Sequence, residues 1–209
     1  MEKAPPNITA LVLAAGEASR MGGPKQLLSW RGTTFLENIL DQINNSLVSR
    51  TLVVLGAHSG QITAQIEKRE GAVLLYNEDW KSGLGSSIAC GARYLTEKNI
   101  STDGLLILLA DQPLVDHHYI NTLIAGFAEG EKKMVATLYG HGMGVPALFS
   151  KDYFGALTQL RSDVGAKELI AKNRGHVLAI DPGEKSLDVD TRQQYRILLQ
   201  KDKDQTITD

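Results

Sequence analysis

Residues 11–25, LVLAAGEASRMGGPK, carry the groups best suited to holding a chain of phosphates. An apolar run breaks into small residues at 14–16, and the polar loop that follows contains two cations, Arg20 and Lys25. Small side chains let backbone N–H groups approach phosphate oxygens, and fixed cations neutralise phosphate charge. This loop therefore predicts a nucleoside triphosphate site.

The spacing of the loop excludes two common phosphate-binding motifs. A GxGxxG fingerprint would need glycine where Ala18 stands. A GxxxxGK[ST] loop would need a shorter interval than Gly16 to Gly22, and Gln26 follows the lysine. The loop is thus predicted to be neither a dinucleotide fingerprint nor a kinase-type P-loop.

Carboxylates at two places in the chain could bind a divalent cation. Asp111 follows the most apolar run, LLILLA, and Asp188 and Asp190 belong to the segment DVDT. Mg²⁺ prefers one or two carboxylates together with phosphate oxygens. In an extended segment Asp188 and Asp190 point the same way, and either of them or Thr191 could cap the helix that follows.

The segment 82–87, SGLGSS, offers backbone and hydroxyl donors at the start of a helix. Such donors could contact a base or a phosphate, or could cap the helix only. The preceding Trp80 is predicted to pack against the protein rather than to stack on a base.

Strands and helices alternate along most of the chain. Strands are expected at 9–13, 51–55, 72–76, 105–109, 134–139, 147–149 and 176–180. Helices are expected from residue 33 or 34, at 59–68, 86–96, 116–127, 151–159 and 163–172, and after 191. Alternation of this kind predicts an α/β fold with a largely parallel sheet. Ligands would bind at the carboxyl ends of its strands, in loops 14–25, 77–85, 110–113 and 140–146.

Length and composition predict one globular domain, residues 1–200, with a disordered tail at 201–209. The formal net charge of −2 argues against a general nucleic-acid or membrane-surface binder. A single cysteine, Cys90, excludes an internal disulfide. The chain contains no apolar run of roughly 20 residues and no signal peptide, so a cytoplasmic location is expected.

Six segments together resemble a known family. In chain order they are LVLAAGEASRMGGPKQLL, WKSGLGSS, LLADQP, GMGVPALF, SDVGAKEL and DVDT, spanning about residues 9–199. They resemble the MobA-like NTP transferases, and most closely the molybdenum cofactor cytidylyltransferase (MocA-like) branch. The resemblance implies a three-layer, Rossmann-like fold of the nucleotide-diphospho-sugar transferase (GT-A-like) type with a mostly parallel sheet.

The resemblance also implies roles for individual residues. The nucleotide would be contacted by Leu13, Ala14, Ala15, Gly16, Arg20, Lys25, Gly83, Gly85 and Ser87. Lys25, Arg20 and Asp111 would be catalytic, and Asp111 and Asp190 would hold Mg²⁺. Gly144, Pro146 and Asp163 would border the second substrate.

The reaction implied is transfer of CMP from CTP to the phosphate of molybdopterin, with release of pyrophosphate and with a molybdoenzyme as a further partner. Three other enzymes are kept as alternatives: a guanylyltransferase, a sugar-phosphate nucleotidyltransferase and a metal-dependent glycosyltransferase of similar fold. A non-catalytic carrier of molybdenum cofactor is the alternative from another class.

Overall fold

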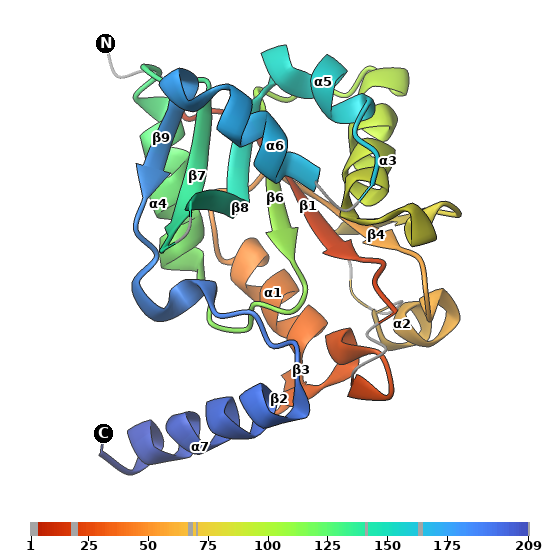
Figure 1. Ribbon diagram of the computed structural model, residues 1–209, viewed down its shortest axis with the longest axis vertical. Coiled ribbons are helices and arrows are strands. Elements are labelled where there is room, and N and C mark those ends of the chain that lie inside the picture. Colours follow the sequence, from red (N-terminus) through yellow and green to blue (C-terminus); the bar gives the residue numbers. More distant parts are fainter. Residues whose placement is uncertain are drawn as a thin grey trace.

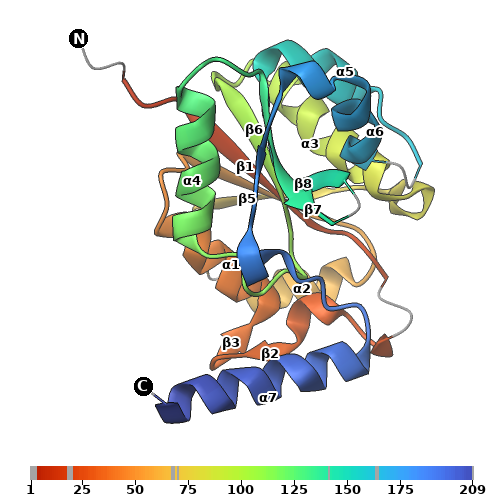
Figure 2. The same cartoon turned by 60° about the vertical axis from the view of Figure 1, so that its left-hand side comes forward.

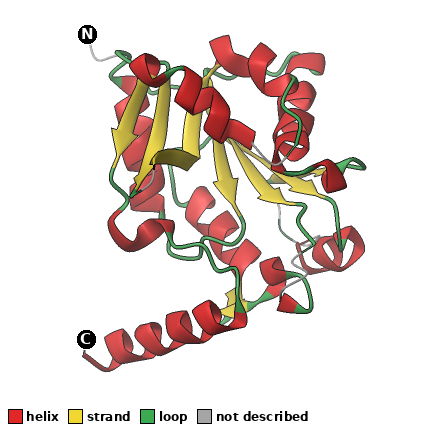
Figure 3. Ribbon diagram, in the orientation of Figure 1, coloured by secondary structure: helices red, strands yellow, loops and turns green. Residues whose placement is uncertain are grey.

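The structure is a computed structural model that describes residues 4–17, 21–66, 69, 71–140, 142–162 and 165–208. A seven-stranded sheet forms its centre (Figures 1 and 3). In spatial order its strands are β5 (Ala72–Tyr76), β4 (Arg50–Leu55), β1 (Ile8–Ala14), β6 (Gly104–Leu109), β8 (Gly142–Ser150), β7 (Met134–Tyr139) and β9 (Val177–Ile180). Only β8 runs antiparallel to its neighbours. The expected α/β class with a mostly parallel sheet is confirmed.

Helices cover both faces of the sheet (Figure 2). One face packs against α1 (Phe35–Asn44), α2 (Ser59–Ile66) and α4 (His117–Ala128). The other packs against α3 (Leu84–Glu97), α5 (Phe154–Thr158) and α6 (Gly165–Lys172). The last helix, α7 (Arg192–Thr208), packs beside the small hairpin of β2 (Ser29–Trp30) and β3 (Thr33–Thr34) and projects from the body (Figure 1).

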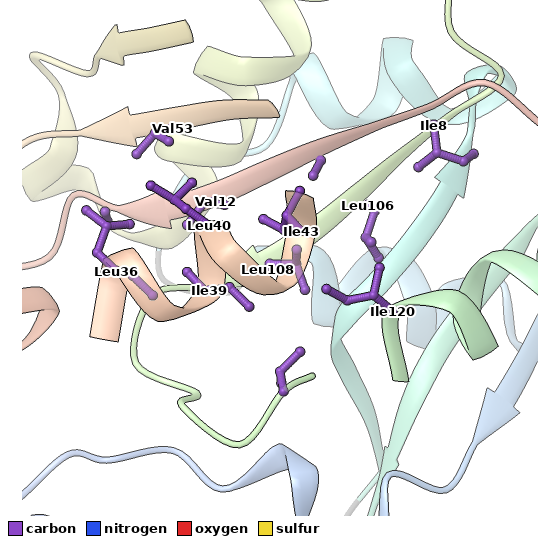
Figure 4. Close-up of a cluster of buried hydrophobic side chains, with 14 of the residues drawn as sticks. Ile8, Val12, Leu36, Ile39, Leu40, Ile43, Val53, Leu106, Leu108 and Ile120 are labelled. Carbon is purple, nitrogen blue, oxygen red and sulfur yellow. The ribbon is translucent and has the colours of Figure 1, made fainter. Parts of the chain in front are cut away.

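Strand β1 shows why the sequence selects this layered arrangement. Its alternate residues Val12 and Ala14 join the core beneath α1, whereas Leu11 and Leu13 join the core beneath α3. Figure 4 shows the first core, where Val12 meets Leu40 of α1. A strand that is buried on both faces reads as a continuous apolar run, because neither face meets water.

The sheet brings two chemically important loops together at one edge. From β1 the chain proceeds to β4 and β5 on one side, and then returns to β6 on the other side of β1. Leu13 pairs with Leu109 across these parallel neighbours, and Ala110 N donates to Leu13 O at 3.2 Å. Ligands bind at such a switch point because the loops after the two strands diverge and leave a crevice.

Two boundaries differ from the sequence-based expectation. The expected turn at 140–146 is mostly strand, because Gly142 and Gly144 pair with Tyr139 and Thr137 in an extended β7–β8 ribbon. Residues 201–208, expected to be a disordered tail, continue helix α7. None of the helices within the described ranges is both long and apolar enough to cross a membrane.

The contacts of Asp116, the residue before α4, can be tested by substitution. Its Oδ1 accepts from Tyr119 N at 2.8 Å, and its Oδ2 pairs with Lys185. Burial opposes ionisation, but these partners outweigh it and lower the pKa of Asp116 below its usual value. The ionised carboxylate therefore stabilises the folded state, and this contribution is lost as pH falls through the lowered pKa.

We expect Asp116→Ala to lower the free energy of unfolding by about 1 kcal/mol near neutral pH. Asp116→Asn keeps a capping oxygen and should cost less. Urea unfolding at about pH 7 and about pH 3 checks the sign, because the difference between wild type and the alanine variant should shrink in acid. A difference of equal size at both pH values would contradict the assigned charge effect.

Candidate active site

Lys25 lies at the centre of the site and contacts both predicted metal ligands. Its Nζ donates to Asp190 Oδ1 at 2.9 Å and forms an ion pair with Asp111 Oδ2. The Lys25 and Asp111 side chains are 18% and 13% exposed, whereas Asp190 is 50% exposed. Residues from three separate parts of the chain therefore meet at one point.

The carboxylates of Asp111 and Asp190 stabilise the positive charge of Lys25. Burial disfavours the Lys25 ammonium, but the carboxylates of Asp111 and Asp190 outweigh that effect and raise the pKa of Lys25 above its usual value. Lys25 is therefore positively charged near neutral pH.

Backbone contacts carry Asp190 to its position. Val189 N donates to Asp111 O at 3.1 Å, and the Val189 side chain is fully buried beside Trp30. The segment after β9 is thereby fixed to the loop after β6.

The cap of α7 decides which group of this segment is available for binding. Thr191 Oγ1 accepts from Gln194 N at 3.2 Å, and Gln194 Oε1 accepts from Thr191 N at 2.8 Å. These reciprocal bonds form a capping box. Thr191 thus provides the cap, and the Asp190 carboxylate is left to face Lys25.

Asp188 lies beside this centre but has a different environment. Gln112 Nε2 donates to Asp188 Oδ1 at 2.7 Å and to Tyr139 Oη at 3.2 Å. Burial, together with the nearby charge of Asp111, raises the pKa of Asp188 to about 6. The residue pattern did not separate Asp188 from Asp190, and only the family resemblance favoured Asp190 as the metal ligand. In the structure the two carboxylates have different partners, Gln112 for Asp188 and Lys25 for Asp190.

A pocket of about 310 Å³ opens at the carboxyl ends of β1 and β6. Its wall includes most of the residues predicted to bind nucleotide, namely Leu13, Ala15, Gly16, Lys25, Gly83 and Ser87, together with Asp111. Trp80 also lines it, because Gly56 leaves room: a Cβ at Gly56 would lie 2.6 Å from Trp80 Cβ. Trp80 therefore both packs, as predicted, and borders the pocket.

Several predicted residues lie elsewhere. Ala14 is buried and outside the pocket wall. Gly85 also lies outside the wall, where a Cβ would meet Ser162 O at 2.8 Å, so its small size serves helix packing. Arg20 and Asp163 fall outside the described residues, and their assigned roles stay predictions.

A second pocket of about 220 Å³ adjoins the first and shares Leu84 and Leu109 with it. Its wall combines Gly144, predicted to border the second substrate, with Tyr139, Met143, Lys167 and Asp188. The other such residue, Pro146, is buried beside it in β8, where its carbonyl accepts from Thr137 Oγ1 at 2.7 Å. One pocket thus carries Lys25 and Asp111, and its neighbour carries Lys167 and Asp188.

Sequence reasoning missed Gln26, which shapes the first loop. The side chain is 3% exposed, and its Nε2 donates to Ala14 O at 3.1 Å and to Gly16 O at 3.0 Å. Both carbonyls belong to the turn that borders the first pocket. A polar residue directly before the apolar pair Leu27 and Leu28 was the available signal.

We expect Gln26→Leu to lower the free energy of unfolding by about 1–3 kcal/mol, because two carbonyls lose their donor. Nucleotide affinity should fall as well, since the turn loses its brace. Urea unfolding and calorimetric titration with a non-hydrolysable CTP analogue measure the two effects. Gln26→Glu keeps the size without the donor and should resemble leucine, whereas the exposed Gln159→Leu should change neither quantity. Unchanged stability in both Gln26 variants would refute the bracing role.

The donor set at Lys25 fits a hard divalent cation. Asp111 and Asp190 supply carboxylate oxygens, and the Lys25 ammonium shows that a cation is stable between them. Among the described residues, no group of three or more His, Cys, Asp or Glu side chains could hold a metal by itself. A cation here would complete its coordination with water or phosphate oxygens.

Comparisons with known proteins agree with this geometry. Residues 10–177 match the model of the MobA-like NTP transferase domain. The nicotine blue oxidoreductase of Paenarthrobacter nicotinovorans is 29% identical over 92% of this chain and 97% of its own. The purine catabolism protein PucB of Bacillus subtilis is 30% identical (91% and 95%), and a probable molybdenum cofactor guanylyltransferase of Bacillus cereus is 28% identical (92% and 95%).

Solved structures show the same fold. Rv0371c of Mycobacterium tuberculosis H37Rv has a TM-score of 0.78 and 30% identity, covering 94% of this chain and 100% of its own. Its complex with manganese has a TM-score of 0.74 and 31% identity, with coverages of 93% and 98%. The chain therefore belongs to the MobA-like NTP transferase family, a nucleotidyltransferase family related to the molybdenum cofactor.

Proposed function

We propose that this protein transfers CMP from CTP to the phosphate of molybdopterin and releases pyrophosphate. The observation that carries the proposal is the pair of adjoining pockets, with Lys25 and Asp111 in the wall of one and Lys167 in the wall of the other. A donor nucleotide and an anionic acceptor could lie in them so that the acceptor reaches the α-phosphate.

The chain's own residues would act by electrostatics. A phosphate monoester has a second pKa near 6, so the acceptor is largely a dianion at neutral pH and needs no general base. Two anions must meet and a third must leave. Lys25 would bind the triphosphate and stabilise the charge that develops at the α-phosphate, with Arg20 as a second cation.

Asp111 and Asp190 would hold Mg²⁺. When bound, Mg²⁺ supplies Lewis-acid neutralisation of phosphate charge and orients the triphosphate for in-line attack. Asp111 follows β6 and Asp190 precedes α7, so these two carboxylates would hold the ion between the two elements. A manganese complex of a relative, Rv0371c, supports divalent metal binding in this fold.

The choice of CTP rests on Ala15, which lines the first pocket and stands where the guanylyltransferase branch usually has a second glycine, and on the resemblance of PKQLL to the cytidylyl branch. The molybdopterin acceptor is proposed because one relative is named a probable molybdenum cofactor guanylyltransferase. A cytoplasmic protein would meet both substrates and could pass its product to a molybdoenzyme.

The test is to incubate the purified protein with Mg²⁺, molybdopterin and each of the four nucleoside triphosphates separately, and to measure pyrophosphate. Release with CTP is the expected result. Release with GTP alone would identify a guanylyltransferase. Release only when a sugar phosphate replaces molybdopterin would identify a sugar-phosphate nucleotidyltransferase. Binding of molybdopterin without consumption of any nucleotide would identify a non-catalytic carrier.

A further inference from the structure

We infer that the Lys25 ammonium occupies the divalent-cation position between Asp111 and Asp190 in the nucleotide-free protein, so that a divalent cation binds tightly only when a nucleotide takes over the ammonium. The inference rests on the proposed function, because it concerns the same metal centre. It adds to that function a dependence of metal binding on nucleotide binding.

Lys25 contacts both of the proposed metal ligands. Its Nζ bonds Asp190 Oδ1 at 2.9 Å while it pairs with Asp111 Oδ2, so one ammonium uses an oxygen of each proposed metal ligand. A cation that bound those same oxygens would have to displace the ammonium, because the two would lie within a few ångströms of one another. Unit charges of the same sign at such a distance repel strongly.

The ion pair between Lys25 and Asp111 is largely buried. Lys25 is 18% exposed and Asp111 is 13% exposed, so water screens this pair only weakly. The ammonium will not leave the acids for bulk solvent without a strong replacement partner. A divalent cation arriving alone therefore competes with a resident cation and gains only part of its attraction to the carboxylates.

A triphosphate supplies the missing partner. Lys25 lines the pocket in which the phosphates would lie, so its ammonium can move from carboxylate to phosphate oxygens within that pocket. The vacated carboxylate oxygens then accept the cation that accompanies the triphosphate. Lys25 thus partly neutralises the acid pair between turnovers and yields the carboxylate oxygens readily only when a triphosphate takes over the ammonium.

The decisive measurement is Mn²⁺ binding to the nucleotide-free protein, followed by electron paramagnetic resonance of the free ion. We expect Lys25→Met to bind Mn²⁺ at least about tenfold more tightly than wild type, because the competing ammonium is gone. Lys81→Met is the matched control. Lys81 lines the same pocket but lies over the Trp80 ring, with its Nζ 5.4 Å from the ring centroid.

Removing Lys81 also removes one positive charge from the pocket wall, but it frees no oxygen of Asp111 or Asp190. The Mn²⁺ affinity of Lys81→Met should therefore stay within about threefold of wild type. Equal tightening in both variants would show a general charge effect and overturn the inference. Weaker or unchanged Mn²⁺ binding in Lys25→Met would also overturn it. Asp190→Asn should weaken Mn²⁺ binding in every background.

A measurement on the wild-type protein avoids any folding defect of the variant. Mn²⁺ titrated without nucleotide should increase the rate at which an amine-reactive reagent labels Lys25, followed by mass spectrometry of its peptide, since each bound ion frees the ammonium. Labelling that Mn²⁺ slows or leaves unchanged would refute displacement. Pyrophosphate release by wild type is measured separately: turnover with no displacement refutes only the dependence of metal binding on nucleotide binding, and no turnover with any nucleotide refutes the proposed function.

Discussion

Asp111→Asn should lower the rate of pyrophosphate release at saturating substrates by a factor of roughly 10² or more, the scale seen when one group that stabilises a transition state is lost. Asp111 is 13% exposed and pairs with Lys25, and in the proposed site it would also offer an oxygen to Mg²⁺. Asparagine has nearly the same shape but carries no charge, so it would weaken both interactions. Steady-state kinetics with CTP and molybdopterin measure the effect.

Asp152→Asn is the matched control for Asp111→Asn. Asp152 is half exposed and pairs with Lys133 at 3.0 Å on the surface, where ion pairs contribute little to stability. The rate of pyrophosphate release by Asp152→Asn should stay within about twofold of wild type. If Asp111→Asn kept a wild-type rate while remaining folded, the metal-binding role assigned to Asp111 would be wrong.

Lys25→Ala should also cost a factor of roughly 10² or more in turnover, and it should raise the KM for CTP as well. The reason is that Lys25 would contact the triphosphate in the ground state and stabilise added charge in the transition state. Truncation also leaves Asp111 partly buried without its cation, so thermal unfolding must be followed in parallel.

The surface lysine Lys133, the partner of Asp152, gives the corresponding control: Lys133→Ala should keep both kinetic constants. The two active-site variants differ in their response to excess metal. Raising Mg²⁺ should partly restore Asp111→Asn, which has lost a metal ligand, but should not restore the KM for CTP of Lys25→Ala. Full recovery of Lys25→Ala by added Mg²⁺ would show that its positive charge, rather than its position, is what matters.

The two pockets are built from different parts of the fold. The groups at the first pocket come from the carboxyl ends of β1 and β6, which the parallel sheet holds rigidly together. The second pocket is built from the β7–β8 ribbon, α6 and Asp188.

The apolar runs and their order along the chain were enough to predict the fold class and the position of the first loop. Apolar runs such as 9–13 and 105–109 are long enough and continuous enough to predict strands buried on both faces. Alternation of strands with helices then predicts a parallel sheet with loops at one edge. Asp111 follows the second of these runs almost directly, and Lys25 lies in the loop after the first, so the local pattern was enough to predict both residues at that edge.

The roles of Asp190, Asp188 and Gln26 became clear only from contacts in the folded chain. Asp190 lies 165 residues from its partner Lys25, and its position depends on the bond from Val189 N to Asp111 O and on Thr191 capping α7. No local pattern encodes those contacts, because each joins segments that become neighbours only when the sheet has formed. Side-chain contacts of this kind are decided by packing in three dimensions, whereas strands and helices follow from the periodicity of the chain.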